Sequence, residues 1–367
     1  KEELDCLYEQ AKFQPIIGNL KDEGRQPEWA KPYLIHKTKA GTNIAFLAYT
    51  FPYYITYAPN GWQVLEPMAR LEEDLARPEV RDADIVVVLS HLGVRYDEQI
   101  AETYPQVNLV IGSHTHHLFE EGKLVNETYL AAADRYGYYL GCIDLTVENG
   151  RLIECQIEAI PTKSYILDLD KEDETFIKAM REEGHRRLAQ KKVANLGREL
   201  DFDETCQLVL QAVCQETHSQ LTLLNTGLIM KTLGPQVTMA DLQEALPHQM
   251  RMARLVVTGQ ELKEICQEVF TKAELLKNQA IKGMGFRGKT FGEVITGNFA
   301  YKNGNLLYNR RVVDSNEKFS LVLVDQYYFA SYFPTIKEKE VTLLFPDLLR
   351  ELVAKYLGKN GANWDKI

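Results

Sequence analysis

Histidines are concentrated at one point of the chain, in the segment Val110–Phe119, which reads VIGSHTHHLF. His114, His116 and His117 lie directly after the apolar run VNLVIG and are three of the eight histidines in the chain. A second apolar run, IVVVLS, is followed by His91. Neutral imidazole is a good ligand for Zn, Mn, Fe and Ni ions, so histidines released by two neighbouring strands could together bind a metal.

The spacing of these histidines predicts how their side chains point. In an extended segment, His114 and His116 project to the same side and His117 projects to the other. The apolar runs before them lack polar alternation, which is typical of strands buried on both faces of a sheet. Ligands gather at the carboxyl ends of the strands in α/β sheets, and this is where His91 and the HTHH segment would lie.

A structural role is the alternative for any single histidine, and it is preferred for His117. His36, His185 and His218 are expected to be surface or capping residues. The role of His248, which follows Leu246-Pro247, is left open. A two-metal site also needs carboxylates to bridge the ions. No Asp-x-His or Gly-Asn-His/Asn-Glu motif precedes His91. Asp97, six residues past His91, could lie near such a site, but its position favours the surface of a helix.

Apolar periodicity predicts an α/β domain in the first part of the chain. The segment Lys1–Lys12 is helix-like, Pro67–Leu75 has a helical period, and Glu148-Asn-Gly150 between two strand-like runs predicts a hairpin. The domain is expected to end near Pro161. The expected strands are Phe13–Asn19, Asn43–Tyr49, Ala83–Leu89, Val107–Ile111, Tyr129–Ala132, Gly137–Val147 and Arg151–Ala159.

A second domain is expected after a linker, Pro161–Asp170, and a charged helix over about Lys171–Lys192. It mixes helices and strands, and the chain is long enough for two domains with sizeable cores. The expected helices are Asp203–His218, Met239–Ala245, Gly259–Thr271 and Pro346–Gly358, and the expected strands are Leu221–Leu224, Arg254–Thr258 and Lys318–Val324.

Composition disfavours several classes of protein. The chain has 367 residues, of which 45% are hydrophobic and 26% charged, and it contains no apolar run long enough to span a membrane. Its net charge of −10 disfavours non-specific binding to nucleic acid or to an anionic membrane, since both need a basic surface. The six cysteines form no CxxC pair, which favours free thiols in a reducing compartment and hence the cytoplasm.

The order of SHLG at residues 90–93 and HTHH at residues 114–117 resembles the calcineurin-like metallophosphoesterases. Over essentially the whole chain, the sequence is similar to the two-domain 5′-nucleotidase/2′,3′-cyclic phosphodiesterase family, in its unsecreted Gram-positive branch. The segments that resemble this family's C-terminal domain are LNTG at 224–227, VTMADL at 237–242, LVVTG at 255–259, GMGFRG at 283–288 and DQYYFASYFP at 325–334.

This resemblance implies a fold class and a domain organisation. The α/β part, residues 1–162, would be a four-layer αββα metallophosphoesterase sandwich that is N-terminally incomplete. Residues 163–192 would form the linker and connecting helix. Residues 193–367 would form a mixed α+β 5′-nucleotidase C-terminal domain that binds the substrate.

The resemblance also implies two-metal hydrolysis, in which two divalent ions, Zn or Mn, activate a water molecule that attacks phosphorus. His116 matches the histidine that binds the first metal, and His91 and His114 match two ligands of the second. The family's other ligands, and its transition-state histidine, belong to motifs expected upstream of Lys1. The chain is therefore expected to be a fragment that is inactive alone, with its catalytic residues unknown.

For the substrate, the resemblance implies a flat aromatic slot for a base, with Phe286 as one face and Tyr332 or Phe333 as the other. Core packing is the alternative for each ring. The secreted nucleotidases have an arginine where this chain has Met230, and arginines elsewhere could supply the lost contact. The candidate substrate-binding residues are Phe286, Arg287, Tyr332, Phe333, Asn225 and Arg251.

The predicted function is a dinuclear-metal phosphohydrolase of nucleotides, of the 5′-nucleotidase type. A cyclic-nucleotide phosphodiesterase or a nucleotide-sugar hydrolase is the alternative within the same class. A non-catalytic nucleotide-binding or interaction module is the alternative from another class. The expected partner is a small phosphoester, with no nucleic acid and no membrane, and the sequence carries no signal for an oligomeric state.

Overall fold

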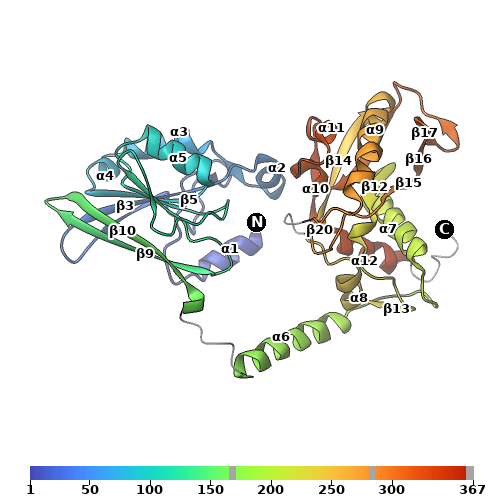
Figure 1. Cartoon of the computed structure of the whole chain (residues 1–367), viewed down its shortest axis with the longest axis horizontal. Coiled ribbons are helices and arrows are strands. Elements are labelled where there is room, and N and C mark those ends of the chain that lie inside the picture. The colour runs from blue at the N-terminus through green and yellow to red at the C-terminus, as the bar shows by residue number, and fades with distance from the viewer. Residues whose placement is uncertain (165–170, 282–285, 361–367) are drawn as a thin grey trace. The chain divides into compact units, whose positions relative to one another are not determined.

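The computed structural model describes residues 1–164, 171–281 and 286–360. The chain divides into two compact units, Lys1–Glu172 and Asp173–Ile367 (Figure 1). Residues 165–170 of the expected linker and residues 282–285, which include two glycines of the GMGFRG segment, lie outside the described residues. Within the described part, no helix combines the length and the apolar character needed to cross a membrane.

The first unit contains a six-stranded sheet with the order β2-β3-β5-β6-β8-β7. Strands β3, β5, β6 and β8 are parallel, and the outer strands β2 and β7 are antiparallel to their neighbours. The helices of this unit are α1 (Glu2–Glu9), α2 (Tyr54–Tyr57), α3 (Pro67–Leu75), α4 (Pro78–Arg81) and α5 (Val94–Thr103). The strands are β1 (Leu20–Lys21), β2 (Tyr33–Lys37), β3 (Asn43–Thr50), β4 (Gln63–Val64), β5 (Ile85–His91), β6 (Leu109–Gly112), β7 (Lys123–Val125), β8 (Thr128–Ala131), β9 (Tyr139–Glu148) and β10 (Arg151–Pro161).

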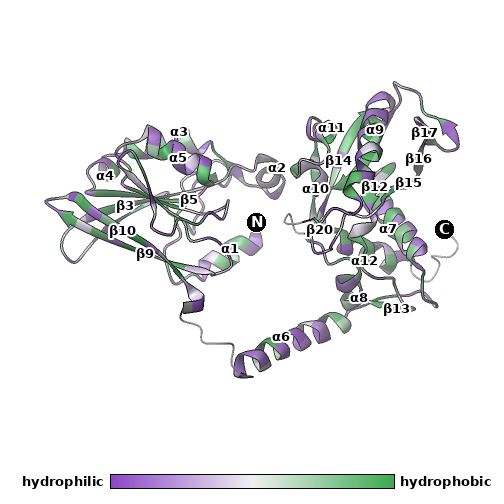
Figure 2. Ribbon diagram, in the orientation of Figure 1, coloured by the Kyte–Doolittle hydropathy of each residue, from purple (hydrophilic) through white to green (hydrophobic). Residues whose placement is uncertain are grey.

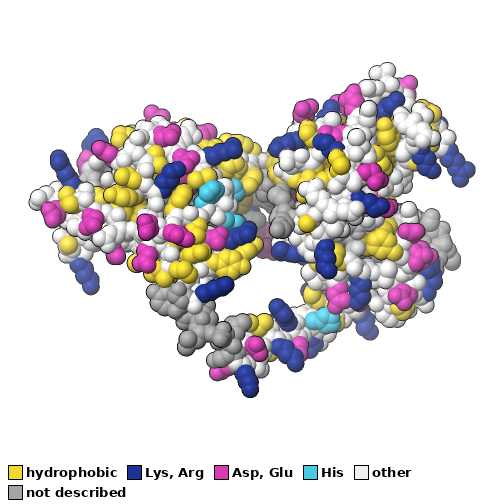
Figure 3. Space-filling model, in the orientation of Figure 1, with side chains coloured by type: hydrophobic (Ala, Val, Ile, Leu, Met, Phe, Trp, Pro, Cys, Tyr) yellow, Lys and Arg dark blue, Asp and Glu magenta, His cyan; other side chains and the backbone are white. Residues whose placement is uncertain are grey.

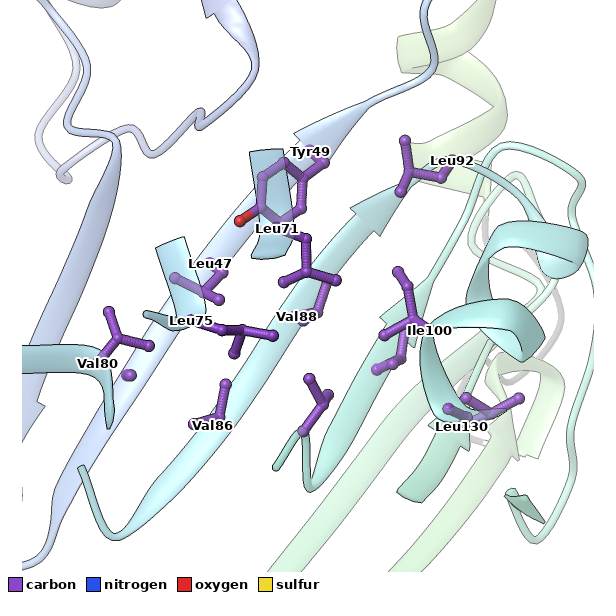
Figure 4. Close-up of a cluster of buried hydrophobic side chains, with 14 residues drawn as sticks. Leu47, Tyr49, Leu71, Leu75, Val80, Val86, Val88, Leu92, Ile100 and Leu130 are labelled. Carbon is purple, nitrogen blue, oxygen red and sulfur yellow. The ribbon is translucent and has the colours of Figure 1, made fainter. Parts of the chain in front are cut away.

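Helices cover one face of this sheet and the hairpin β9–β10 covers the other. Leu71 of α3 and Ile100 of α5 pack against Val88 of β5 on the helical face (Figure 4). On the opposite face, Val87 packs in a cluster with Ile143 of the hairpin. Because successive side chains of a strand point to opposite faces, a strand covered on both sides is apolar throughout, as IVVVL is.

The hairpin agrees with the sequence prediction, whereas the first expected strand is wrong. Asn149 and Gly150 have φ angles of 49° and 73°, and a type I′ turn requires positive φ at both of these central positions. The segment Phe13–Asn19 forms only an isolated bridge, between Ile16 and Lys31. Pro15 lies inside that segment and has no N–H to donate to a neighbouring strand.

The second unit contains a five-stranded sheet with the order β15-β12-β19-β14-β20, in which only the pair β12 and β19 is parallel. Helix α6 (Lys171–Ala189), at the start of this unit, has no buried residue and is largely hydrophilic (Figure 2). The other helices are α7 (Phe202–Glu216), α8 (Met239–Ala245), α9 (Gly259–Leu276), α10 (Gln326–Phe329), α11 (Pro334–Lys337) and α12 (Leu349–Asn360). The strands are β11 (Lys192–Asn195), β12 (Leu221–Asn225), β13 (Gln236–Thr238), β14 (Arg251–Thr258), β15 (Val294–Gly297), β16 (Phe299–Lys302), β17 (Asn305–Tyr308), β18 (Arg311–Val312), β19 (Lys318–Val324) and β20 (Thr342–Leu348).

The helix expected from Pro346 begins later, at Leu349, because Pro346 belongs to strand β20. β20 lies at the edge of its sheet, where a residue without an N–H donor is tolerated. Helix α8 has the predicted bounds, since Thr238 and Asp241 form a capping box at its start.

Candidate metal centre

Two neighbouring strands bring the histidines to one edge of the first unit's sheet. β5 and β6 are parallel, and Ser90 of β5 lies opposite Gly112 of β6. His91 therefore follows this pair by one residue and His114 by two, at the carboxyl ends of both strands, where α/β sheets bind their ligands. Histidine side chains gather at the surface of this unit in Figure 3. A pocket of about 340 Å³ opens here, and it is lined by His91, Ser113 and Thr50 among others.

The rings of His91 and His114 lie edge to face, with centroids 4.8 Å apart and planes at 74°. Burial lowers the pKa of both imidazoles, and the charge of His116 nearby lowers both further. Both rings are therefore neutral near neutral pH, and a neutral imidazole is the form that binds a metal. The structure thus brings His91 and His114 together, with His116 within electrostatic reach.

The backbone of the HTHH segment is not extended. His114 and His116 have φ angles of 64° and 54°, in the left-handed region that residues other than glycine rarely adopt. The N–H of Thr115 donates to the carbonyl of Ser113 at 2.7 Å, so the chain turns between the two histidines. The prediction that His114 and His116 project to the same side is therefore wrong in assuming an extended segment. Left-handed backbone at residues other than glycine is a local strain of a kind that clusters at functional sites.

Side-chain hydroxyls tie the two histidine segments to each other. Ser113 Oγ donates to the carbonyl of Ser90 at 3.0 Å, and the N–H of Val94 donates to Thr115 Oγ1, also at 3.0 Å. Thr115 Oγ1 lies 2.9 Å from His117 Nδ1 as well. Through this contact, His117 supports the turn on which His114 and His116 sit.

Asp97 is a correction to the sequence analysis, because the structure places it in the interior. Its side chain is on α5, the residue is 4% exposed, and its carboxylate accepts a hydrogen bond from Ser90 Oγ. Burial raises the pKa of Asp97 to about 6, although the bond from Ser90 partly opposes this rise. Ile100 and Ala101, three and four residues on, are also buried, so Asp97 belongs to the inward face of the helix.

Over residues 1–164, 171–281 and 286–360, no group of three or more His, Cys, Asp or Glu side chains is arranged to hold a metal ion. His91 and His114 fit the donor set of a transition metal, since they are adjacent, neutral and at strand ends. A complete site takes at least three protein ligands, one more than this pair supplies.

In the second unit, Phe286 stacks on His248 rather than on another aromatic side chain. The ring centroids are 4.7 Å apart and the planes differ by 25°. His248 is fully buried, its Nδ1 accepts a hydrogen bond of 2.9 Å from the N–H of Arg287, and its Nε2 has no partner among the described residues. Burial lowers the pKa of His248 to about 4, so this ring is neutral. Phe286 is 6% exposed, so its ring is almost entirely covered by the protein itself.

The two rings expected opposite Phe286 differ in exposure. Phe333 is fully buried and packs edge-on against Phe291 and Tyr327. Tyr332 is half-buried, so it keeps an accessible surface. Among the described ring contacts, neither of them touches Phe286.

The remaining candidates for substrate binding have different surroundings. Asn225 is fully buried, and its side-chain amide bonds to the carbonyl of Phe291 and to a tyrosine hydroxyl, so both ends are used within the fold. Arg251 lies 5.1 Å from the centre of the Phe345 ring, and its buried Nε has no hydrogen-bond partner among the described residues. Arg287 is exposed.

Comparison with known proteins identifies the family. No protein-family model matches the chain. YunD from Bacillus subtilis, an uncharacterized metallophosphoesterase, is 33% identical over 374 aligned residues, which cover 96% of this chain and 80% of YunD. The chain belongs to the metallophosphoesterase family.

Solved structures share the fold of this metallophosphoesterase over both units. A Staphylococcus aureus protein assigned as a 5′-nucleotidase matches with a TM-score of 0.63 at 13% identity, over 99% of this chain and 78% of its own. NAD nucleotidase from Haemophilus influenzae matches with a TM-score of 0.59 at 14% identity, over 98% of this chain and 79% of its own. The predicted class, an α/β metallophosphoesterase domain followed by a mixed α+β 5′-nucleotidase domain, is confirmed. Family membership makes the protein a phosphoric ester hydrolase and implies divalent metal ions.

Two aromatic residues beside the histidines of this metallophosphoesterase were not predicted from the sequence. Phe51 stacks on the ring of His114, with centroids 5.0 Å apart and planes at 18°, and Tyr53 Oη lies 3.4 Å from His114 Nε2. Both follow strand β3, which pairs with β5. The available signal was the aromatic segment FPYY directly after an apolar strand, but only the strand order shows that it meets the histidines.

Proposed function

We propose that this metallophosphoesterase is a dinuclear-metal-dependent phosphohydrolase that acts on nucleotides, of the 5′-nucleotidase type. The observation that carries the proposal is the adjacent, neutral pair His91 and His114 at the ends of parallel strands. Two divalent ions, Zn or Mn, are the proposed cofactors, since imidazole is a ligand for both. The fold shared with NAD nucleotidase supports a nucleotide as the substrate.

In this proposal, His116 binds one metal while His91 and His114 bind the other. When bound, the ions would lower the pKa of a water molecule and offset the negative charge of the phosphoryl oxygens. The protein's own contribution is to hold its ligands: Phe51 covers one face of His114, and Thr115 fixes the turn between His114 and His116. Because a dinuclear site needs bridging carboxylates, the three histidines alone would leave the chain inactive.

We also propose that residues 193–367 bind the substrate and that residues 163–192 connect them to a metallophosphoesterase domain of residues 1–162. Tyr332, which is half-buried, is the ring that would contact a base, and Phe286, which is 6% exposed, would contact it only at its remaining exposed edge. Arg287 and Arg251 would contact its phosphate or ribose. Asn225 and Phe333 are fully buried, so they would support the loops that carry these residues.

Free thiols support a cytoplasmic location in the same proposal. All six cysteines are free, and Cys6 and Cys142 are exposed. Exposed thiols persist where glutathione and thioredoxin keep them reduced. Fractionation of cells that produce the protein would test this, and recovery outside the cytoplasm would contradict it.

A hydrolysis assay with Mn²⁺ or Zn²⁺ tests the proposed activity, using a nucleoside monophosphate, a 2′,3′-cyclic nucleotide, a nucleotide sugar and p-nitrophenyl phosphate. It compares the chain alone with the full product of its gene. We expect the full product to release phosphate from the monophosphate, and His91→Ala and His114→Ala to lower the rate about 100-fold or more, as loss of a metal ligand does. His36→Ala is the matched control, since His36 is exposed on β2 and should change nothing.

The outcomes separate the parts of the proposal. Hydrolysis that persists after removal of all divalent ions would overturn the metal dependence. Strong activity in the chain alone would overturn the need for further ligands. Preference for the cyclic nucleotide or the nucleotide sugar would move the substrate to another class while leaving the metal centre intact.

A further inference from the structure

The geometry around Asp97 points to a positioning residue that holds both histidine segments, Ser90–Gly93 and Gly112–His117. The inference rests on the proposed function, in which His91 and His114 bind metal. Asp97 is on α5 and its side chain accepts a hydrogen bond from Ser90, the residue before His91, so it acts through the backbone that carries the rings.

The first segment is fixed on both sides of His91 through a single hydroxyl. Ser90 Oγ donates to the carboxylate of Asp97 and accepts a hydrogen bond of 3.2 Å from the N–H of Leu92. Ser90 and Leu92 are both buried, so water does not compete for these bonds. Ser90 and Leu92 flank His91, so the hydroxyl that bonds to α5 also holds the backbone on the far side of His91.

The second segment lies directly against the other oxygen of the same carboxylate. A Cβ on Gly112 would overlap Asp97 Oδ2, so this position of β6 accepts only glycine while Asp97 keeps its place. Gly112 comes two residues before His114. Ser113, between them, bonds through its hydroxyl to the carbonyl of Ser90, which joins the second segment to the first.

A carboxylate is an unfavourable choice for this position unless its polar contacts are needed. Asp97 is in the interior, and a buried carboxylate costs free energy that an apolar residue would not. The nearby side chains of Leu92 and Ile100 belong to the apolar cluster on the helical face of the sheet. Positioning of the two histidine segments is a function that offsets this cost.

The test combines Mn²⁺ affinity, measured by calorimetry on the full gene product, with hydrogen–deuterium exchange of both segments, which needs no metal. The variants are Asp97→Ala, Asp97→Asn and Gly112→Ala. The matched control is Glu98→Ala, which removes a partly exposed carboxylate, paired with Lys123, one residue away on the same helix. His114→Ala is included as a test of the metal assignment.

We expect Asp97→Ala to weaken Mn²⁺ binding about tenfold, the lower end for loss of an outer-shell partner. It should also speed exchange in both segments. Gly112→Ala should do the same although the carboxylate is retained, because the added methyl group displaces it. Asp97→Asn keeps an acceptor for Ser90 and should restore affinity to within about threefold of the wild type. Glu98→Ala should behave as the wild type.

Each result has a defined reading. Wild-type Mn²⁺ affinity in Asp97→Ala, or faster exchange in only one segment, would overturn the inference, as would an equal effect of Glu98→Ala. Should Asp97→Ala fail to fold, Gly112→Ala and Asp97→Asn decide in its place. Unchanged Mn²⁺ binding in His114→Ala, or no binding in the wild type, would overturn the metal assignment, and the exchange data alone would then decide whether Asp97 couples the two segments.

Discussion

Replacing His248 with phenylalanine should remove a step in the pH dependence of stability of the second unit. His248 is fully buried, its ring stacks on Phe286, and its Nδ1 accepts a hydrogen bond from the N–H of Arg287. Burial lowers its pKa to about 4, and the charges of Arg287 and Arg350 lower it further, against the opposing effect of the carbonyls nearby. A phenylalanine keeps the ring and the stack but does not titrate.

The sign and size of this pH dependence follow from the pKa values of His248 in the folded and unfolded states. The folded state has a pKa of about 4 and the unfolded chain about 6.5, so between these values the unfolded state binds more protons. The stability contributed by the neutral ring is therefore complete above about pH 6.5 and is lost as the pH falls towards 4. The loss is about 2 kcal/mol between pH 7.5 and pH 5 and about 3 kcal/mol by pH 4, at about 1.4 kcal/mol per pKa unit. His248→Phe also leaves the N–H of Arg287 unpaired, which costs about 1–3 kcal/mol at every pH.

Urea unfolding, followed by a signal that comes from the second unit alone, would measure this pH dependence of stability. Its thiols, Cys206, Cys214 and Cys266, are free and buried. A pulse of 4,4′-dithiodipyridine, which reacts at acidic and neutral pH, followed by mass spectrometry would give the unfolded fraction. The free energies of unfolding of wild type and His248→Phe should converge by about 2 kcal/mol from pH 7.5 to pH 5. A difference that stays constant with pH would refute a buried neutral imidazole. The control is His218→Asn, at an exposed position of the second unit, which should follow the wild type throughout.

Three further predictions use urea unfolding, followed by the thiol pulse for the second unit and by tryptophan fluorescence for the first unit, in which Trp62 is buried. Relative to the wild type, the free energy of unfolding of Asp97→Asn should rise by up to about 3 kcal/mol as the pH rises from about 4 to 7. The pKa of Asp97 in the folded state is raised to about 6, so ionisation of its carboxyl destabilises the folded wild type. Parallel curves for the two proteins would contradict this. Gly227→Ala should destabilise the second unit by about 1–3 kcal/mol, since its Cβ would overlap backbone carbonyls, whereas Gly234→Ala, with open space at its Cβ, should be nearly neutral. Tyr49→Phe should cost about 1–3 kcal/mol, because the buried carboxylate of Asp74 loses a hydrogen bond of 3.0 Å; a neutral result would show that its arginine partners suffice.

Local signals in the sequence predicted the elements best where they agreed with each other. Helix α3 has the predicted bounds because its helical period begins at a proline in the first turn, and α8 because a capping box precedes it. Short or irregular strands such as β15 to β18 were not predicted, because runs of four residues or fewer carry little periodicity. β20 was missed since its proline reads as a helix start, and only its place at the sheet edge explains it.

The site could be predicted only in part, for a physical reason. Types and spacing predicted that His91 and His114 lie close together, because His91 ends one apolar strand and His114 comes two residues after the next, and the structure places their rings side by side. Asp97 and Phe51 were misjudged or missed, since their neighbours are set by the order β3-β5-β6 of the sheet. Sequence distance says little about residues that strand pairing brings together. The left-handed conformation of the HTHH segment is likewise a product of tertiary contacts, because local preference disfavours it at histidine.

That conformation has a consequence for metal binding. Two non-glycine residues at positive φ, His114 and His116, cost about 1–2 kcal/mol each. The bonds from Val94 to Thr115 and from Ser113 to the other segment return about 1 kcal/mol each, and the stack of Phe51 on His114 about 1 kcal/mol more, so the strain is roughly balanced. In the proposed metal centre, these contacts would hold His114 and His116 in place, and loosening this turn should lower metal affinity more than it lowers the stability of the fold.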